Sequence, residues 1–298
     1  MNNRIHYLQC PVCASAEIKN VLIAKDHTVS GESFSIAECG NCSLRFTQDV
    51  PDATAISPYY KAEDYISHTN ISKGLVNRAY QLVRKRTMIK KRKLIEKFTG
   101  VKRGKLLDVG SGTGNFVNEM KENEWQVTGL EPDSDARKVA AQLYGLQLKD
   151  TGELFQLQPE GFDAVTLWHV LEHVHDLHAY IQRLKVLLSK KGKLFIAVPN
   201  YTSLDSQVYK EHWAAYDVPR HLYHFSPKSM NILMENNGLK IIKYKPMWYD
   251  SFYISLLSSK YQAGKTSWVA AFFNGLRSNL KTIGNVQRCS SVIYIIEK

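Results

Sequence analysis

The sequence predicts an α/β fold with a mostly parallel sheet, preceded by a small zinc-binding β module. Three observations predict it: β-type runs alternate with helical stretches from Lys105 onward, a glycine-rich turn follows the first of these runs, and two C-x-x-C pairs stand within the first 50 residues. The chain has 298 residues, of which 44% are hydrophobic and 22% are charged. This composition is typical of globular proteins and excludes the disordered, collagenous and coiled-coil classes.

The cysteines define the first element, residues 1–50. Two pairs, "CPVC" and "CGNC", are separated by 25 residues that include the β-type run "SFSIAEC". Four thiolates in two such pairs can close a tetrahedral zinc site, which leaves no open position for catalysis. Two redox dithiols are the alternative. We expect a structural zinc ion held by Cys10, Cys13, Cys39 and Cys42, and we expect Cys289 to be a buried or incidental thiol.

Residues 51–103 are expected to form a linker and a basic helical connector. The stretch "VPDATAISPYY" is rich in turn-forming residues, and apolar residues follow helical spacing from about Ser72 to Phe98. From Lys73 to Lys105 there are thirteen Lys or Arg and one acid, so this stretch carries +12; because the net charge is +11, the rest of the chain sums to −1. A solvated cationic face, a nucleic-acid or anionic-lipid site, and attraction of an anionic substrate all remain open.

From Lys105 the β-type runs are "KLLDVG", "WQVTGLE", "FDAVTLW" and "KLFIAVP", with helical stretches at 114–123, 133–144 and 176–189 between them. This alternation predicts right-handed βαβ units and a parallel sheet. A further helix should begin after Ser226 and Pro227 and end at Gly238. The runs "LKIIKYKPM" and "SVIYIIEK" are expected to close the sheet as an antiparallel pair.

The most informative segment is "LLDVGSGTGNF", in which three glycines join a strand to a helix. Glycine is needed where the backbone turns at positive φ or approaches a ligand closely. Twenty-one residues after Gly110, Glu131 stands at the end of the second strand, where a carboxylate can bind both hydroxyls of a ribose. A dinucleotide site needs G-x-G-x-x-G, but its last position is Asn115, which argues against NAD.

These motifs, together with "GLEPD", "FDAVTLWHVLEHVHD" and "LLSKKGKLFIAVPN", resemble those of class I S-adenosylmethionine-dependent methyltransferases, from about residue 104 to about 247. The resemblance implies a Rossmann-like, seven-stranded, mostly parallel sheet flanked by helices, in a domain spanning 104–298 with an insertion at 249–288. It also implies S-adenosyl-L-methionine as cofactor, with its methionine end at the glycine loop, its ribose on Glu131 and its adenine near Asp150. The cofactor-binding residues implied are Asp108, Gly110, Ser111, Gly112, Thr113, Gly114, Glu131, Pro132, Asp150, Trp168 and His169.

Two polar segments supply candidate catalytic residues. "WHVLEHVHDLH" follows the strand "FDAVTL" and contains His169 and His173, with His175 and His178 as weaker candidates. His169, Glu172 and His173 also spell the inverted zinc-protease signature H-x-x-E-H, but that site needs both histidines on a stable helix. Helix capping or surface hydrogen bonds are the alternative role for each histidine.

The second segment is "WAAYDVPRHLYHFSP", residues 213–227, which resembles the "PRHLxHF" segment in a branch of methyltransferases. Titratable groups among aromatic residues in a loop suit substrate positioning and proton transfer. A structured lid packed by its aromatic side chains is the alternative. We expect the catalytic base among His169, His173, His221 and His224, and substrate binding by Tyr216, Asp217 and Arg220.

The remaining expectations concern location and partners. The N-terminus lacks the apolar region of a secretory signal, and no apolar run reaches the ~18 residues of a membrane span, so we expect a cytoplasmic protein. The apolar insertion 249–288 is expected to pack in the core or at a dimer interface, with peripheral membrane contact as an alternative. The chain is expected to be a monomer or a homodimer.

The predicted function is methyl transfer to a small or carrier-linked acceptor. Some sugar methyltransferases carry an N-terminal cysteine-rich zinc module, which favours a sugar or cell-surface polysaccharide intermediate as the acceptor. Two alternatives remain open: an RNA methyltransferase that uses the basic helix, since nucleic acid is not excluded as a partner, and a non-catalytic S-adenosylmethionine-binding adaptor.

Overall fold

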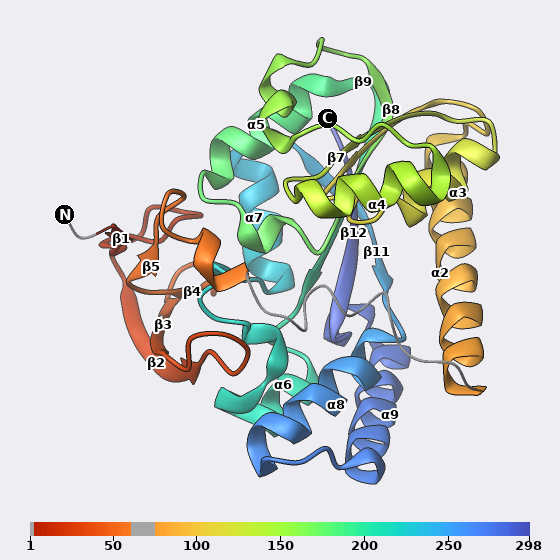
Figure 1. The fold of residues 1–298 in the computed structure, drawn as a ribbon. Helices are drawn as coiled ribbons and strands as arrows, with labels where there is room; N and C mark the ends of the chain where they lie inside the picture. The colour runs from red at the N-terminus through yellow and green to blue at the C-terminus, as the bar shows by residue number, and fades with distance from the viewer. Residues whose placement is uncertain (1–2, 61–74) are drawn as a thin grey trace. The chain divides into compact units, whose positions relative to one another are not determined.

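The computed structural model describes residues 3–60 and 75–298, and in the first long helix it describes side chains from residue 83 onward. The chain forms two compact units, which we treat separately (Figure 1). The cysteine unit comprises Met1–Tyr65, Leu171–His178 and Ala197–Tyr294, and the glycine-loop unit comprises Ile66–Val170, Ala179–Ile196 and Ile295–Lys298. Residues 61–74 of the predicted connector 51–103, and the predicted helix start at Ser72, lie outside the described residues.

The glycine-loop unit is built on parallel strands in the order β9-β8-β6-β7: β6 (Lys105–Val109), β7 (Gln126–Leu130), β8 (Phe162–Trp168) and β9 (Leu188–Pro199), which leaves this unit after Ile196. Strand β6 is parallel to both neighbours, and Leu106 lies opposite Val127 on β7 and Ala164 on β8. Four of the five residues of β6 are buried, because helices cover both faces of such a sheet. Beyond β7, one parallel bridge joins Leu130 to Lys149.

Four helices accompany these strands: α2 (Leu75–Thr99), α3 (Asn115–Glu122), α4 (Ser134–Tyr144) and α5 (Leu177–Leu187). Apart from the start of α2, whose predicted position lies outside the described residues, each helix end agrees with the sequence prediction to within about two residues. Helix α4 begins after Asp133, whose carboxylate accepts the N–H of Asp135, and it ends at Gly145 with φ 59°. Local capping therefore sets the ends of α4, as the sequence suggested.

The cysteine unit contains a four-stranded antiparallel sheet in the order β10-β4-β3-β2 and a separate pair of β1 and β5. The strands are β1 (Arg4–Ile5), β2 (Ile18–Lys25), β3 (Ser33–Cys39), β4 (Arg45–Thr47), β5 (Val50–Pro51) and β10 (Tyr223–His224). In β10, Tyr223 lies opposite Phe46 and His224 lies opposite Arg45. The "PRHLYHF" segment thus completes the sheet of the cysteine module, although about 170 residues separate them.

The rest of the cysteine unit consists of helices, short 3-10 turns and two strands. They are η1 (Ser57–Tyr60), η4 (Leu171–His173), α6 (Leu204–Tyr209), η5 (Lys210–His212), η6 (Ala214–Tyr216), α7 (Pro227–Asn236), β11 (Lys240–Pro246), α8 (Asp250–Ala263), α9 (Trp268–Gly284), η7 (Val286–Arg288) and β12 (Ser291–Glu297). As predicted, Ser226 caps α7 and Pro227 opens it; the Ser226 hydroxyl accepts from the N–H of Ser229.

Strand β12 lies between β11, its predicted neighbour, and β9, and it runs against β9. Within the cysteine unit, the N–H of Asn200, which follows β9, donates to the carbonyl of Ser290 at 2.8 Å. Within the glycine-loop unit, Lys193 of β9 pairs with Glu297 at 3.0 Å. Partners of β9 therefore move backward along β12, so the two strands are antiparallel. Among the described residues, no helix has both the length and the hydropathy needed to cross a membrane.

Candidate functional site

The glycine loop begins where β6 ends, at a buried carboxylate. Asp108 is 1% exposed, and its Oδ1 accepts a hydrogen bond from Thr166 Oγ1 on β8 at 2.5 Å. Burial raises the pKa of Asp108 from its ordinary 3.8 to about 6. A cationic ligand group beside Asp108 would favour the ionised form and would lower this pKa again.

The three glycines turn the chain at positive φ, with values of 74° at Gly110, 52° at Gly112 and 77° at Gly114. A Cβ at Gly110 would lie 2.3 Å from Val170 Cγ2, so no larger residue fits there. A Cβ at Gly112 would meet nothing within 4 Å. Gly112 therefore combines a glycine-specific backbone with open space beside it, as close approach of a ligand requires.

Glu131, at the end of β7, is 8% exposed and faces this loop. Its Oε2 accepts the N–H of Gly112 at 2.7 Å, and its Oε1 accepts the N–H of Asp133 at 3.0 Å. Burial raises its pKa, although both hydrogen bonds favour the carboxylate. Since a carboxylate has about four acceptor positions, Glu131 retains capacity for ribose hydroxyls.

Arg137 of α4 organises the segment after Glu131. One of its guanidinium nitrogens donates to the carbonyl of Pro132 at 2.9 Å and pairs with Asp150 at 3.0 Å. Asp150 also caps the following 3-10 turn by accepting the N–H of Gly152. The carboxylate of Asp150 is therefore held in place by Arg137 and by the backbone N–H of Gly152.

The end of β8 supplies an aromatic wall. Trp168 packs edge-on against Phe116 at 5.5 Å between ring centroids, and Lys91 Nζ of α2 lies 4.1 Å from the centre of a Trp168 ring. Trp168 Nε1 is buried, and no hydrogen-bond partner for it is found among the described residues. The next residue, His169, has φ 59°, an uncommon backbone conformation outside glycine that often marks functional sites.

These residues fit S-adenosylmethionine better than a dinucleotide. The cofactor carries a sulfonium and an ammonium group, which suit the buried carboxylate of Asp108. A dinucleotide would place its pyrophosphate at the same loop, against Asp108 and Glu131, where like charges repel. The open space at Gly112 and the buried donor of Trp168 are further features that a ligand could use.

In the cysteine unit, the four predicted metal ligands lie together. The ligand sulfurs of Cys10, Cys13, Cys39 and Cys42 are all within 4.8 Å of one another. Sγ of Cys10 lies 3.4 Å from Sγ of Cys42, and Sγ of Cys13 lies 3.6 Å from Sγ of Cys39. Backbone N–H groups of Val12 and Cys42 point at sulfurs at 3.5 Å, which favours thiolates. Four sulfurs at this spacing fit a tetrahedral zinc ion, for which Zn–S is about 2.3 Å.

A second cluster in the cysteine unit joins the two histidine segments. The rings of His173 and His221 stand edge to face, 4.6 Å apart. Nδ1 of His173 lies 2.9 Å from the carbonyl of Arg220, and Nδ1 of His221 lies 2.8 Å from the carbonyl of Ala215. Carbonyls only accept, so both Nδ1 atoms carry a proton, and the free lone pair of a neutral ring would lie on Nε2.

Glu172 completes this cluster. It is fully buried, and it offers a carboxylate oxygen within 4.8 Å of ligand atoms of His173 and His221. Tyr60 adds a hydroxyl 3.0 Å from Nδ1 of His173. Burial, followed by the neighbouring His221, lowers the pKa of His173 from 6.5 to about 4. His173 is therefore neutral near pH 7, with a lone pair on Nε2.

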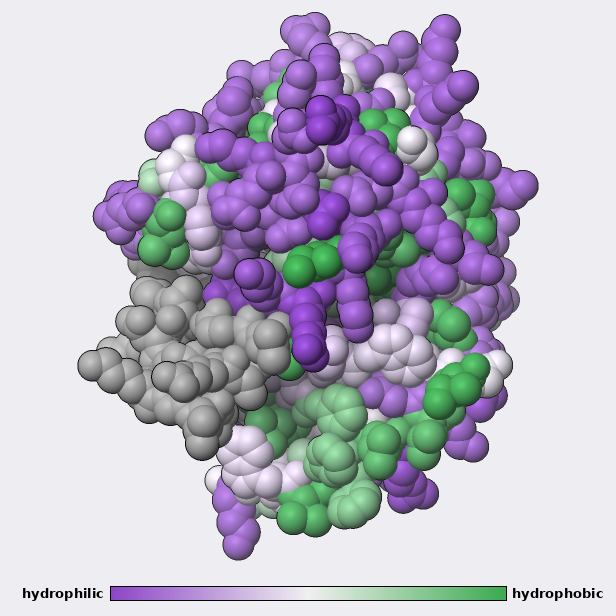
Figure 2. All heavy atoms as spheres, turned by 90° about the vertical axis from the view of Figure 1, so that its right-hand side faces the viewer, coloured by the Kyte–Doolittle hydropathy of each residue, from purple (hydrophilic) through white to green (hydrophobic). Residues whose placement is uncertain are grey.

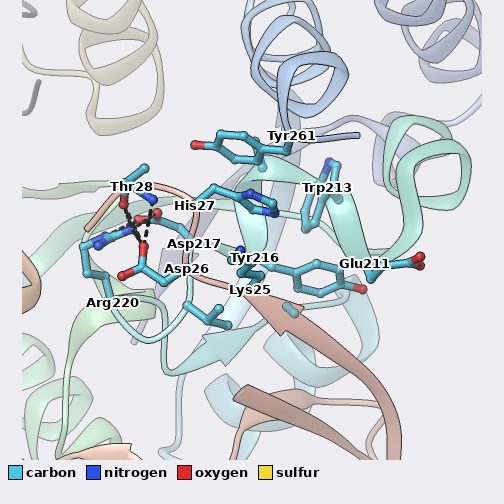
Figure 3. A pocket seen from close by; sticks show the side chains of 13 residues that line it. Lys25, Asp26, His27, Thr28, Glu211, Trp213, Tyr216, Asp217, Arg220 and Tyr261 are labelled. Carbon is cyan, nitrogen blue, oxygen red and sulfur yellow. Dashed lines mark hydrogen bonds and ion pairs between the residues drawn. The ribbon is translucent and has the colours of Figure 1, made fainter. Parts of the chain in front are cut away.

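The other predicted substrate residues are engaged within the fold. Arg220 is 3% exposed; it donates to Asp217, to Asp26, to the Tyr59 carbonyl and to the Thr28 hydroxyl (Figure 3). Burial raises the pKa of Asp217, but the hydrogen bond from Arg220 and the charges of His221, Arg220 and His173 together lower it below its ordinary value. The cavity beside them measures about 10 Å³, room for about one water molecule.

Two further candidates lie in the hydrophobic core of this unit. Tyr216 is 2% exposed, and its hydroxyl accepts from Arg45 at 2.7 Å. Nε2 of His224 lies 3.1 Å from Thr47 Oγ1, and burial lowers the pKa of His224 well below 6.5. His224 thus stays neutral. Of the weaker candidates, His175 contacts the Pro51 carbonyl at 3.1 Å and His178 contacts Asn237 at 3.1 Å.

The structure groups the predicted residues into a glycine-loop set, a cysteine set and a histidine set. Sequence reasoning missed Lys91, Arg137, Glu172 and Tyr60. Only Glu172 had a signal, since it stands inside the H-x-x-E-H motif; that motif spans the end of β8 and the short turn η4 rather than a stable helix. The other three are ordinary residues of a basic helix, an amphipathic helix and a linker, so nothing in their spacing marks them.

Comparison with known proteins settles the family. A model of the methyltransferase domain matches residues 80–244, more than half of the 298 residues. The chain belongs to the methyltransferase family. The predicted α/β methyltransferase fold is thereby confirmed, although among the described residues its sheet has six strands rather than the seven predicted. The glycine loop lies within the matched region.

Individual relatives share less than a third of their residues with this chain over the matched region. The ubiquinone biosynthesis O-methyltransferase of Xanthomonas euvesicatoria is 29% identical over 160 residues, which cover 49% of this chain and 66% of that protein. The human mitochondrial ubiquinone biosynthesis O-methyltransferase is 28% identical over 165 residues, covering 50% of this chain and 44% of that protein. The chain therefore spans between 44% and 66% of the length of these curated relatives.

Among solved structures, the magnesium protoporphyrin IX methyltransferase of Synechocystis is similar with a TM-score of 0.53 and 16% identity, covering 83% of this chain and 100% of that one. The 1,6-didemethyltoxoflavin N1-methyltransferase of Burkholderia thailandensis gives a TM-score of 0.50 at 15% identity, covering 92% and 99% of the two chains. At these identities the likeness shows the shared fold.

Proposed function

We propose that this chain transfers a methyl group from S-adenosylmethionine to a hydroxyl of a small or carrier-linked acceptor. One observation carries the proposal: a methyltransferase-family glycine loop whose open glycine, Gly112, is hydrogen-bonded to the buried Glu131 and stands near the buried Asp108. Both carboxylates suit a cationic, ribose-bearing cofactor.

In this proposal Asp108 and the backbone of the loop bind the methionine end, and Glu131 binds the ribose. Pro132 and Asp150, which Arg137 holds together, border the adenine. Lys91 adds a cation near Asp108, where it favours the ionised carboxylate and could pair with the cofactor's own carboxylate. Ser111 and Thr113 belong to the loop backbone, and Trp168 with His169 would close the site at the end of β8.

The acceptor is activated by proton removal. The acceptor O–H proton would pass to Nε2 of His173 or His221, with Glu172 stabilising the resulting imidazolium. The acceptor oxygen would attack the methyl carbon in line, and the C–S bond would break with its electron pair left on sulfur. Alignment of the acceptor supplies several kcal/mol of the barrier reduction in such displacements. His224, which hydrogen-bonds within the core, is the less suitable base.

Two considerations support a hydroxyl acceptor. The relatives named above are O-methyltransferases by name, and imidazole side chains suit the removal of a hydroxyl proton. The cysteine module favours a sugar or cell-surface polysaccharide intermediate, since it resembles the module of some sugar methyltransferases.

The proposal is tested by following S-adenosylhomocysteine release with a panel of nucleotide sugars and phenols. We expect His173→Gln and His221→Gln each to lower kcat by about 10²-fold or more while leaving cofactor affinity within twofold. His178→Gln is the matched control, and we expect full activity from it. Equal activity of all three variants would contradict the assignment of the base.

The thirteen cations between Lys73 and Lys105 keep an RNA acceptor as the second candidate. At least three of them are engaged within the glycine-loop unit, because Arg92 pairs with Glu96 and Glu119, Arg103 pairs with Glu124, and Lys91 Nζ lies over a Trp168 ring. An RNA enzyme should lose RNA affinity steeply as salt rises. A non-catalytic adaptor would bind the cofactor without turnover of any acceptor in the panel.

A further inference from the structure

Helices α8 and α9 expose large apolar side chains and bury small ones. On α9 seven large apolar residues are between 37% and 73% exposed: Trp268, Val269, Phe272, Phe273, Leu276, Leu280 and Ile283. The buried residues of the same helix are Ala271, Gly275, Ser278 and Thr282. Surface helices of proteins surrounded by water show the opposite arrangement, with the apolar face toward the core.

Polar contacts fix which face of α9 points inward. Ser278 donates to the buried Asp205 of α6 at 2.7 Å, and Asn274 donates to the hydroxyl of Tyr209 at 3.0 Å. A Cβ at Gly275 would lie 2.7 Å from a ring carbon of Phe252 on α8, so the two helices are in close contact there. The outward direction of the apolar residues follows from these inner contacts.

Helix α8 has the same arrangement. Its buried positions include four serines and one isoleucine: Ser251, Ile254, Ser255, Ser258 and Ser259. Tyr253 is 49% exposed, and Phe252 stacks on Phe272 of α9 with ring centroids 5.6 Å apart. Figure 2 shows the resulting hydrophobic surface, in green, over α8 and α9 at the bottom of the view. We call this surface the α8–α9 face.

The charge around this face is positive. Between residues 249 and 288 the sequence has five Lys or Arg and one acid, Asp250, which gives a net +4. Asp250 is half-buried, whereas all five cations are exposed: Lys260, Lys265, Arg277, Lys281 and Arg288. Arg277 and Lys281 continue the i, i+4 row of Phe273, so they stand at the border of the exposed apolar residues.

We propose that the α8–α9 face docks the protein on the surface of an anionic lipid bilayer. An amphipathic helix with Trp and Phe on one face and Lys or Arg at its border lies in the plane of the interface, with the apolar side chains about 5–10 Å deep. Trp268 and Phe273 enter the boundary between headgroups and acyl chains. Arg277 and Lys281 reach the lipid phosphates, since their long aliphatic stems allow the charge to stay in the polar layer.

A second copy of this chain is the other occupant to consider, and the charges disfavour it. A two-fold dimer brings the same surface of each protomer against itself. Here it would bring together two segments 249–288, each with five exposed cations, one half-buried acid and a net charge of +4. Such like-charge contacts oppose association. An anionic bilayer satisfies the apolar residues and the cations together.

The test is co-sedimentation of the full, zinc-loaded chain with vesicles of phosphatidylcholine alone or with roughly one third phosphatidylglycerol. We expect at least about tenfold tighter binding to the anionic vesicles. We expect Arg277→Gln with Lys281→Gln to remove most of this preference. Phe273→Ser with Leu280→Ser should weaken binding to anionic vesicles by about tenfold or more.

Leu143→Ser is the matched control, because Leu143 of α4 is 63% exposed, close to the 57% of Leu280, and does not belong to the α8–α9 face. We expect its binding to equal that of the wild type. A second readout is tryptophan fluorescence, which brominated lipid should quench in the wild type and much less in Trp268→Phe. Unchanged thermal midpoints will show that the variants fold.

Three outcomes would overturn the proposal. One is the absence of binding to anionic vesicles. Another is equal binding of the wild type and the Phe273→Ser, Leu280→Ser variant. The third is self-association of the wild type, without vesicle binding, that the same variant abolishes; this result would identify the α8–α9 face as a dimer interface. None depends on methyl transfer, so the proposed function can fail without affecting this inference.

Discussion

At the scale of single residues, Asp108 is held in surroundings that oppose its charge. It is 1% exposed, and desolvation raises its pKa from 3.8 to about 6. A raised carboxyl pKa means that the folded state holds its proton more tightly than the unfolded state, so stability falls as pH rises from 3.8 to about 6 and stays lower above it. Asp108 is therefore costly for stability without a cationic ligand beside it.

This cost predicts the behaviour of Asp108→Asn. We expect the ligand-free variant to be more stable than the wild type at pH 7.5, by on the order of 2 kcal/mol, and to bind S-adenosylhomocysteine at least about tenfold more weakly. Urea unfolding and calorimetry measure the two quantities. A variant that is less stable, with unchanged affinity, would show that Asp108 has a purely structural role.

His173 shows the opposite shift. Its pKa is lowered from 6.5 to about 4, first by burial and then by His221. Between these values the unfolded state binds more protons than the folded state, so stability falls as pH drops from 6.5 toward 4. We expect His173→Gln to lose less stability than the wild type across this range. Unfolding midpoints at pH 7 and pH 5 measure the difference, and parallel losses in both proteins would contradict it.

Substitution of Arg220 distinguishes a structural role of this side chain from a role in substrate binding. It is 3% exposed and joins Asp26 and Asp217 in the cysteine unit. Removing it leaves buried carboxylates unpaired, so we expect Arg220→Met to lose about 3–5 kcal/mol of unfolding free energy. Lys149→Met, which breaks an exposed pair with Glu153, should lose under about 1 kcal/mol. A stable Arg220→Met enzyme with only a raised KM would favour substrate binding instead.

At the scale of elements, the cysteine module and the histidine cluster share one unit. Strand β10, which begins two residues after His221, pairs with β4, and β4 begins three residues after the second cysteine pair. A shift of the backbone at Cys39 and Cys42 would therefore be passed through the β4–β10 pairing to His221. The glycine loop belongs to the other unit.

This arrangement predicts the effect of removing zinc. We expect chelation, or Cys39→Ser, to lower the melting temperature by about 10 °C or more and to abolish turnover. Affinity for S-adenosylhomocysteine should change much less, because the glycine loop lies in the other unit. Calorimetry at 15 °C and thermal scans measure both. Full turnover after complete chelation would show that the four cysteines hold no structural metal.

Elements were predictable where their signals are local. Ser226 and Pro227 predict the start of α7, and Asp133 and Gly145 predict the two ends of α4. The spacing from Gly110 to Glu131 predicts the cofactor loop. Long-range pairings leave no such signal. The sequence could not show that β10 joins β4, that Arg220 meets Asp26, or that α9 turns Phe273 outward, because each depends on residues far away in the chain.

At the scale of the whole molecule, the account rests on the identity of the cofactor. The family match covers residues 80–244, and the two buried carboxylates of the glycine loop lie inside it. The assignment of S-adenosylmethionine as cofactor does not depend on which residue is the base, on the acceptor or on the docking face. If the cofactor is wrong, the proposed reaction is wrong.

The most direct test is isothermal titration calorimetry of the zinc-loaded chain with S-adenosylhomocysteine and, in parallel, NAD. The account predicts micromolar binding of S-adenosylhomocysteine, no binding of NAD, and at least about tenfold weaker binding by Glu131→Ala, because the ribose would lose its carboxylate partner. Binding of NAD alone, or of neither ligand by a folded protein, would contradict the assignment of the glycine loop as an S-adenosylmethionine site.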